Sequence, residues 1–199
     1  MWFGEDALYR ALAWFDRNRD LVPLTAAILD LGCGNGVTCL HLLGEGFSDV
    51  TGVDYSPEAI ELAKKIAAKH GYTTQIKLEV CDILADPADA VFPLHGRKFD
   101  VLFDKGTYDA VSLDPEGARI QRDKYIDNVS GMINDGAFLV ITSCNWTKEE
   151  LSRHFQDRKV LIYVCSTGVP FYILVFQIFI FTRRSPLHSS SSAESLGTW

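Results

Sequence analysis

A glycine-rich turn preceded by an acid is the first feature of the chain that could do chemistry. Residues 28–36 have the sequence ILDLGCGNG, in which Asp30 stands two positions before a G-x-G-x-G pattern. A glycine turn that enters a helix lets a ligand approach the backbone closely, because no Cβ intervenes. The dinucleotide pattern G-x-G-x-x-G would need a glycine at position 37, where the chain has Val37, so the spacing departs from that of a dinucleotide site.

Further acids follow the next apolar runs of the sequence. Asp54 comes 22 residues after Gly32, and a carboxylate there can accept hydrogen bonds from both hydroxyls of a ribose. Asp82 and Asp104 also stand at or just beyond the ends of short apolar runs. An isolated Asp after a strand is more often a helix cap or a turn former. The ordered set of glycine turn and acids nevertheless favours a cofactor site.

Alternating apolar runs and helical patterns define the elements that must position these residues. Strands are expected at 26–31, 49–54, 74–80, 99–103 and 137–142. Helices are expected at 5–16, 36–43, 56–70 and near 119–132, and a capping-box pattern at 147–150 starts one more. Strands separated by helices pair in parallel through crossovers, which predicts a doubly wound, mostly parallel α/β sheet. In such a sheet the ligand lies outside the carboxyl ends of the strands, where the acids fall.

The glycine pattern and its acid resemble motif I of the class I (seven-strand) S-adenosylmethionine-dependent methyltransferases, which have a Rossmann-like fold. The resemblance implies that Asp30 helps to hold the methionine amino group of S-adenosylmethionine. It also implies that Asp82 accepts from the adenine amino group while Ile83 packs on the ring. The residues expected to bind the cofactor are Trp2, Phe3, Asp30, Gly32, Cys33, Gly34, Asp54, Tyr55, Asp82, Ile83 and Asp104.

Three further segments make the resemblance more specific, from the whole class of methyltransferases to one group within it. They are FDKGTYDA at 103–110, WFGE at 2–5 and TSCNWT at 142–147. Together they look like the group of methyltransferases that modify lysines of translation elongation factor 1-alpha, over roughly residues 2–155. The resemblance implies a protein-lysine N-methyltransferase with elongation factor 1-alpha as its protein substrate. Two departures are that relatives have further residues before WFGE, and that residues 159–199 lack the Gly/Ser-containing loop expected between the last two strands.

Methyl transfer to an amine guides the choice of catalytic residues. A lysine amine has a pKa near ~10.4 in water and must lose its proton first, which burial favours. Asp104 is expected to orient the amine or accept its proton, and Tyr108 and Trp146, with Phe3, to form the walls of the channel. The aromatic residues could equally belong to the core. Lys105 is interpreted as a solvated surface charge without a catalytic role.

The composition predicts one soluble globular domain, which we place at residues 1–182. The chain has 199 residues and a formal net charge of −7, and the acidic balance argues against nucleic acid as a partner. Five cysteines without a C-x-x-C pair are expected to be small, reduced core residues, and five histidines without ligand spacing predict no metal site. We expect a monomer located in the cytoplasm and also in the nucleus, with a disordered Ser-rich tail at 183–199.

The end of the chain allows two interpretations. From Val160 to Phe181 there is no charged residue, and Arg183 and Arg184 follow, which meets the simple length criterion for a membrane helix of about 20 residues. A Ser-Thr-Gly pattern with Pro170 in the middle, and many β-branched and aromatic residues, favour an antiparallel hairpin instead.

Two alternative functions remain open at this stage. One is a small-molecule amine methyltransferase, or an aminopropyl-transferring relative, on the same scaffold. The other is a protein that binds the cofactor but is inactive, because of its atypical C-terminal end.

Overall fold

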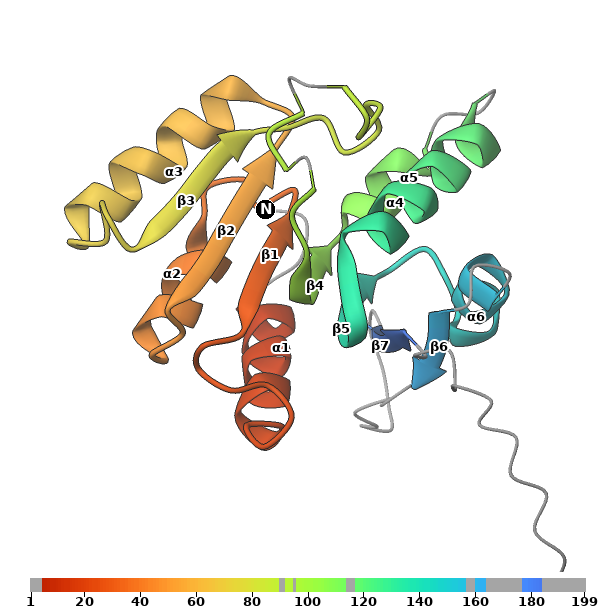
Figure 1. Cartoon of the computed structure of the whole chain (residues 1–199), viewed down its shortest axis with the longest axis horizontal. Helices are drawn as coiled ribbons and strands as arrows, with labels where there is room; N and C mark the ends of the chain where they lie inside the picture. Colours follow the sequence, from red (N-terminus) through yellow and green to blue (C-terminus); the bar gives the residue numbers. More distant parts are fainter. Residues whose placement is uncertain are drawn as a thin grey trace, which may run out of the picture.

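A computed structural model describes residues 5–89, 92–94, 96–113, 117–156, 160–163 and 177–183. In this part of the chain, seven strands form one sheet in the order β3-β2-β1-β4-β5-β7-β6 (Figure 1). The strands are β1 (Ala27–Leu31), β2 (Asp49–Asp54), β3 (Ile76–Val80), β4 (Phe99–Lys105), β5 (Ile133–Ser143), β6 (Val160–Tyr163) and β7 (Gln177–Arg183). The helices are α1 (Glu5–Arg17), α2 (Val37–Gly44), α3 (Pro57–Lys69), α4 (Thr107–Val111), α5 (Ala118–Met132) and α6 (Lys148–Gln156).

The five strands from β1 to β5 pair in parallel, which confirms the predicted doubly wound α/β sheet. β1 lies between β2 and β4, so the chain builds outward from β1 in one direction to β3 and then returns to build β4 and β5 on the other side. The strand order therefore reverses between β1 and β4. Ligands of open α/β sheets bind outside the carboxyl ends of the strands at such a reversal point.

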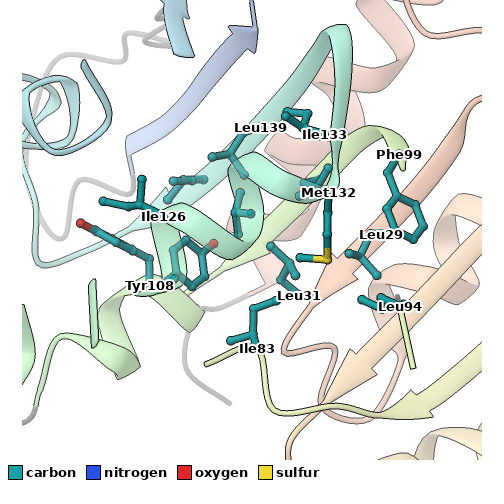
Figure 2. Packing of buried hydrophobic residues seen from close by; sticks show 14 of the residues in the cluster. Leu29, Leu31, Ile83, Leu94, Phe99, Tyr108, Ile126, Met132, Ile133 and Leu139 are labelled. Atoms are coloured by element: carbon teal, nitrogen blue, oxygen red, sulfur yellow. The ribbon is translucent and has the colours of Figure 1, made fainter. Parts of the chain in front are cut away.

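Two apolar clusters lie on the two faces of the sheet. One contains residues of α1, α2 and α3, including Phe15, Leu42 and Ile60, and the other contains residues of α4, α5 and α6. Figure 1 shows α2 and α3 on one side of the sheet and α4 and α5 on the other. Figure 2 shows Leu31 of β1, Ile83 of the loop after β3 and other members of the second cluster packed together. With both faces covered, the strand ends are where a ligand can enter.

The predicted helix starts have the expected chemistry. The hydroxyl of Ser56 accepts a hydrogen bond from the backbone N–H of Ala59 at 3.1 Å, and Pro57 is the first residue of α3. At α6, the hydroxyl of Thr147 accepts from the N–H of Glu150, whose carboxylate accepts from the N–H of Thr147 at 2.9 Å. This reciprocal pair is the predicted capping box. By contrast α4 was not predicted, because its five residues are too few to show a helical period.

Several expectations concern the ends of the chain. β7 pairs antiparallel with β5 and with β6, but residues 164–176 lie outside the described residues, so the predicted hairpin between Val160 and Phe181 stays a prediction. Within the described residues, none of the helices has the length and apolar character to cross a membrane. Trp2, Phe3, Cys165 and the predicted tail beyond Arg183 also lie outside the described residues.

Candidate active site

The glycine turn after β1 takes a conformation that requires glycine. Gly32 and Gly34 have φ values of 66° and 55°, a region that residues with a Cβ rarely adopt. A Cβ on Gly32 would overlap the hydroxyl of Thr107, which donates a hydrogen bond of 2.7 Å to the carbonyl of Leu31. A Cβ on Gly34 would meet nothing within 4 Å. The turn therefore packs tightly against the start of α4 at Gly32 and faces open space at Gly34.

A cavity of about 1040 Å³ lies at the carboxyl ends of β1, β2 and β4. It is lined by Gly32, Cys33, Gly34, Asn35, Val53, Asp54, Tyr55, Cys81, Asp82, Ile83, Leu84, Lys105, Gly106, Thr107, Ala110, Val111 and Gln121. Seven of the residues expected to bind the cofactor are among them: Gly32, Cys33, Gly34, Asp54, Tyr55, Asp82 and Ile83. The structure thus brings together residues that are up to 51 positions apart in the sequence, from Gly32 to Ile83.

Asp54 ties the glycine turn to the end of β2. One carboxylate oxygen accepts a hydrogen bond from the backbone N–H of Gly34 at 2.9 Å, and the other accepts from the N–H of Ser56 at 3.0 Å. The residue is 8% exposed and lines the cavity. Each carboxylate oxygen has a second lone pair, so both can still accept from hydroxyl groups of a ligand. Asp54 can therefore fix its own loop and bind two hydroxyls at once.

The loop after β3 supplies the opposite wall. The carboxylate of Asp82 accepts from the N–H of Leu84 at 2.9 Å, which closes a turn and leaves its second oxygen available. The carbonyl of Ile83 accepts from the side-chain amide of Asn128 on α5 at 2.6 Å. Val53 adds a second apolar group to this wall. The arrangement is suited to a flat, mostly apolar ring with a polar edge.

Asp30, two residues before the glycine turn, is not among the residues that line the cavity. Its side chain is 2% exposed, and its carboxylate accepts from the thiol of Cys39 at 3.4 Å. Burial raises the pKa of Asp30 to about 7, and the nearby ammonium of Lys105 opposes this shift. The expected contact of Asp30 with a ligand amino group stays a prediction.

Asp104 is not brought to the cavity either. Its carboxylate accepts from the backbone N–H groups of Thr107 and Tyr108, at 2.8 and 2.9 Å, and from the hydroxyl of Tyr125. The residue is fully buried, and this burial raises its pKa to about 7. Asp104 therefore caps α4 and holds it against α5. Asp104 is not among the residues that line the cavity, and its predicted contact with a substrate amine stays a prediction.

Tyr108 and Trp146 belong to an aromatic cluster beside the cavity, and neither lines it. The hydroxyl of Tyr108 lies 2.9 Å from Nδ1 of His154, and the ring of Trp146 meets the ring of His154 edge to face at 4.7 Å. The guanidinium of Arg122 lies over the Trp146 ring at 5.2 Å from its centre. Burial lowers the pKa of His154, and the cationic Arg122 adds to this effect. The aromatic residues were expected either to line the substrate channel or to belong to the core. Tyr108 is fully buried and belongs to the core.

The sequence interpretation missed part of the site and one cysteine. Lys105, Thr107, Val111 and Gln121 line the cavity, and none was assigned to it. The first of these follows Asp104 at the end of β4, so the rule that ligands lie beyond strand ends could have indicated it. The expectation that all cysteines are core residues is wrong for Cys144, which is exposed. The backbone N–H of Cys144 donates a hydrogen bond to the buried carboxylate of Asp109 at 2.9 Å.

Among the residues that the structure describes, no three His, Cys, Asp or Glu side chains come together as a group that could hold a metal ion.

Residues 25–174 match the family described as Methyltransferase domain, and the chain belongs to this family. In the solved structures, magnesium protoporphyrin IX methyltransferase from Synechocystis PCC 6803, with bound SAM, has a TM-score of 0.67. It is 18% identical, and the match covers 89% of this chain and 78% of that one, so the likeness shows the fold alone.

Two curated relatives refine the comparison. The chain is 43% identical to EEF1A lysine methyltransferase 2 of Homo sapiens over 157 residues, which cover 79% of this chain and 63% of the relative. It is 33% identical to the protein-lysine N-methyltransferase efm4 of Schizosaccharomyces pombe, over 89% of this chain and 77% of the relative. The resemblance derived from the sequence motifs, to elongation factor 1-alpha lysine methyltransferase 2 (also called methyltransferase-like protein 10), is confirmed by these matches. The chain spans 63% of the length of the human relative.

Proposed function

We propose that this protein is an S-adenosylmethionine-dependent protein-lysine N-methyltransferase that acts on translation elongation factor 1-alpha. The observation that carries the proposal is the 43% identity, over most of this chain, to a human protein named for that activity. The net charge of −7 also favours encounter with a partner surface that presents lysines.

The residues around the cavity fit S-adenosylmethionine. Asp54 offers two acceptor oxygens for the ribose hydroxyls, and the wall formed by Ile83 and Asp82 suits an adenine ring and its amino group. The turn at Gly34 has open space where a side chain would otherwise stand, so a ligand can lie against the backbone. When bound, the cofactor supplies the methyl group.

The chain itself contributes binding, orientation and exclusion of water. The methyl donor is positively charged and loses that charge in the reaction, so a dry site that aligns donor and acceptor supplies much of the rate enhancement. Ala110 and Val111 of α4 form an apolar side of the cavity, and burial there favours the neutral form of an incoming amine. Asp104 acts by holding α4 in place, which makes it a positioning residue.

The test is transfer of labelled methyl from S-adenosylmethionine to purified elongation factor 1-alpha. We expect incorporation into lysine by the wild-type chain and loss of incorporation with Asp54→Ala. Asp49→Ala, at the other end of the same strand, is the matched control and should retain the activity. Absence of labelling by the wild-type chain, or full labelling by Asp54→Ala, would overturn the assignment.

Three further properties belong to the same proposal. The protein is a monomer, does not bind nucleic acid, and works in the cytoplasm and also in the nucleus. The predicted acidic balance supports the second of these, since duplex binding depends on Lys and Arg. Light scattering after gel filtration, retention on immobilised DNA and RNA, and microscopy of the tagged chain test them in turn.

A further inference from the structure

Asp109 is a fully buried carboxylate on α4, next to Ala110, which lines the cavity. It does not cap its own helix, because Asp104 already accepts hydrogen bonds from N–H groups in the first turn of α4. A buried carboxyl group is costly unless it accepts hydrogen bonds, so its partners show what it stabilises. The side-chain partners and N–H donor of Asp109 lie in residues 143–146, which we call the β5 turn.

The conformation of the β5 turn depends on this one carboxylate. One oxygen of Asp109 accepts from the hydroxyl of Ser143 at 2.6 Å, and the other accepts from the backbone N–H of Cys144 at 2.9 Å and from its thiol at 3.4 Å. The hydroxyl oxygen of Ser143 in turn accepts from the N–H groups of Asn145 and Trp146, each at 3.2 Å. The hydroxyl thereby uses its one proton and both lone pairs, so a change in the carboxylate is transmitted to the whole turn.

The β5 turn lies on the side of the sheet from which an acceptor has to approach. Asp54 and Asp82, proposed above to bind the nucleoside of the donor, follow β2 and β3 on one side of the strand reversal. β5 lies beyond β4 on the other side (Figure 1), and its Thr142 pairs in register with Lys105, which lines the cavity. Methyl transfer requires the acceptor nitrogen in line with the methyl group and the sulfur. Because the nucleoside takes the β2–β3 side, the acceptor has to pass the ends of β4 and β5.

Asn145 is the side chain of the β5 turn that is available to such an acceptor. It is exposed, and α6 does not need it as a cap, because Thr147 forms the capping box with Glu150. Its side-chain oxygen accepts from the thiol of Cys144 at 3.5 Å, and within the described part of the chain its side-chain nitrogen has no hydrogen-bond partner. An amide offers two donors and an acceptor, which match the C=O and N–H groups of a polypeptide backbone.

We propose that Asn145 binds the backbone of the polypeptide that carries the acceptor lysine, and that Asp109 is the positioning residue that holds Asn145 in place. The inference rests on the proposed function and deepens it by assigning where the protein substrate is held. The hydrogen bonds that fix Asp54 and Asp82 come from other segments of the chain. Loss of Asp109 should therefore impair use of the acceptor and leave donor binding intact.

Steady-state methylation of elongation factor 1-alpha, with calorimetry of S-adenosylmethionine, tests the proposal. We expect Asn145→Ala to raise the KM for the acceptor protein roughly 10-fold with little change in kcat, as for loss of one or two hydrogen bonds made equally in the ground and transition states. Asp109→Asn replaces one acceptor oxygen by a donor group and should raise the KM to a similar extent. The double variant should be no worse than the more affected single variant, because both changes act through one contact. The Kd for S-adenosylmethionine should equal that of the wild-type chain in all three.

The matched control is Asp100→Asn, near the start of β4. The carboxylate of Asp100 also accepts from a backbone N–H, that of Ala27 at 2.9 Å, and from a side chain, that of Asn134 at 2.8 Å. This variant loses the same kind of contact at the opposite end of the sheet, so its KM for the acceptor should be that of the wild-type chain. A raised KM in Asp100→Asn would mean that the effect of Asp109→Asn is one of general stability, which overturns the positioning role.

Each remaining outcome also decides the proposal. An unchanged KM in Asn145→Ala, or a weakened donor affinity equal to the change in KM, overturns the contact with the acceptor, and additive effects in the double variant overturn the positioning role. If Asp109→Asn does not fold, Ser143→Ala is measured in the same way. A wild-type chain that labels other proteins but not elongation factor 1-alpha would refute the proposed substrate, and the same KM comparison with the labelled protein would then decide this inference. A wild-type chain that labels no polypeptide would overturn both.

Discussion

The ends of β2 and β4 use the same residue type for different purposes. At the end of β2, Asp54 faces the cavity with both oxygens able to accept further hydrogen bonds. At the end of β4, Asp104 is buried and directs its carboxylate at the first turn of α4. The next helix explains the difference. α3 has its own cap in Ser56, whereas α4 begins after Gly106, which has no side chain to cap it, so Asp104 supplies the cap.

An acid at the end of a strand is available to a ligand when another residue caps the following helix, as Ser56 does after Asp54. Removing Asp54 should therefore harm binding most, and removing Asp104 should harm folding most.

Asp54→Ala should raise the Kd for S-adenosylmethionine roughly 1000-fold, or about 4 kcal/mol. The variant loses two acceptors for ribose hydroxyls and leaves the N–H of Gly34 without its partner. Calorimetry measures the affinity. The matched control is Asp49→Ala, which removes only part-exposed ion pairs to Lys77 and Arg97 and should bind normally. A Kd for Asp54→Ala equal to that of the control would break the comparison.

Asp104→Ala should lower the free energy of unfolding by about 3 kcal/mol. It leaves two backbone N–H groups of α4 and the hydroxyl of Tyr125 without an acceptor in a buried place. Urea denaturation of this variant and of Asp54→Ala gives the contrast, since the amides at the cavity can be solvated when Asp54 is removed. Equal losses in the two variants would show that both acids are structural.

Stability should fall as the pH rises from about 4 towards 7. Burial raises the pKa of Asp30 and Asp104 to about 7 in the folded protein, against 3.8 for the ordinary group. Between these values the folded protein retains protons that the unfolded chain has released, so each group destabilises the fold by up to about 1.4 kcal/mol per pH unit. Urea denaturation at several pH values measures the slope.

The matched variant for this slope is Asp104→Asn, which cannot titrate. It should show a shallower fall in stability across the same pH range than the wild-type chain does. Identical slopes would mean that the carboxyl of Asp104 titrates at its ordinary pKa in the folded protein.

The smallest effect is expected in the aromatic cluster. The hydrogen bond between Tyr108 and His154 should give a coupling of about 1 kcal/mol in a double-mutant cycle of Tyr108→Phe and His154→Ala. All three variants should bind S-adenosylmethionine normally, because neither residue lines the cavity. A large loss of donor affinity in Tyr108→Phe would extend the ligand site into this cluster.

The sequence predicted the half of the site that is made by local patterns. The glycine turn, the acid after β2 and the loop after β3 each depend on short spacings, and all of them line the cavity. The predicted boundaries of β2 also match the structure, since Ser56 and Pro57 mark the start of the next helix.

The other half depends on contacts between distant segments. Whether Asp104 faces a ligand depends on Tyr125, which is 21 residues away, and on an unpredicted helix of one turn. The orientation of Lys105 depends on its alternation with Phe103 and on the pairing of β4 with β1. Residue type and spacing alone do not determine these side-chain orientations, because the orientations depend on contacts with distant segments. Gly106, which precedes Thr107, has no side chain to cap a following helix, and this was a local signal that Asp104 would be needed elsewhere.

Gly32 packs closely against Thr107, so the glycine turn after β1 and the start of α4 depend on each other structurally. The turn after β1 has no room for a side chain because the hydroxyl of Thr107 occupies that space and holds the carbonyl of Leu31. A side chain at position 32 would be strained by the φ of 66° even if residue 107 were smaller, so glycine is expected at position 32 whatever residue stands at position 107. Smaller residues at position 107, 75 positions away along the chain, should relieve the overlap in Gly32→Ala but not its backbone strain, so they should restore stability only in part.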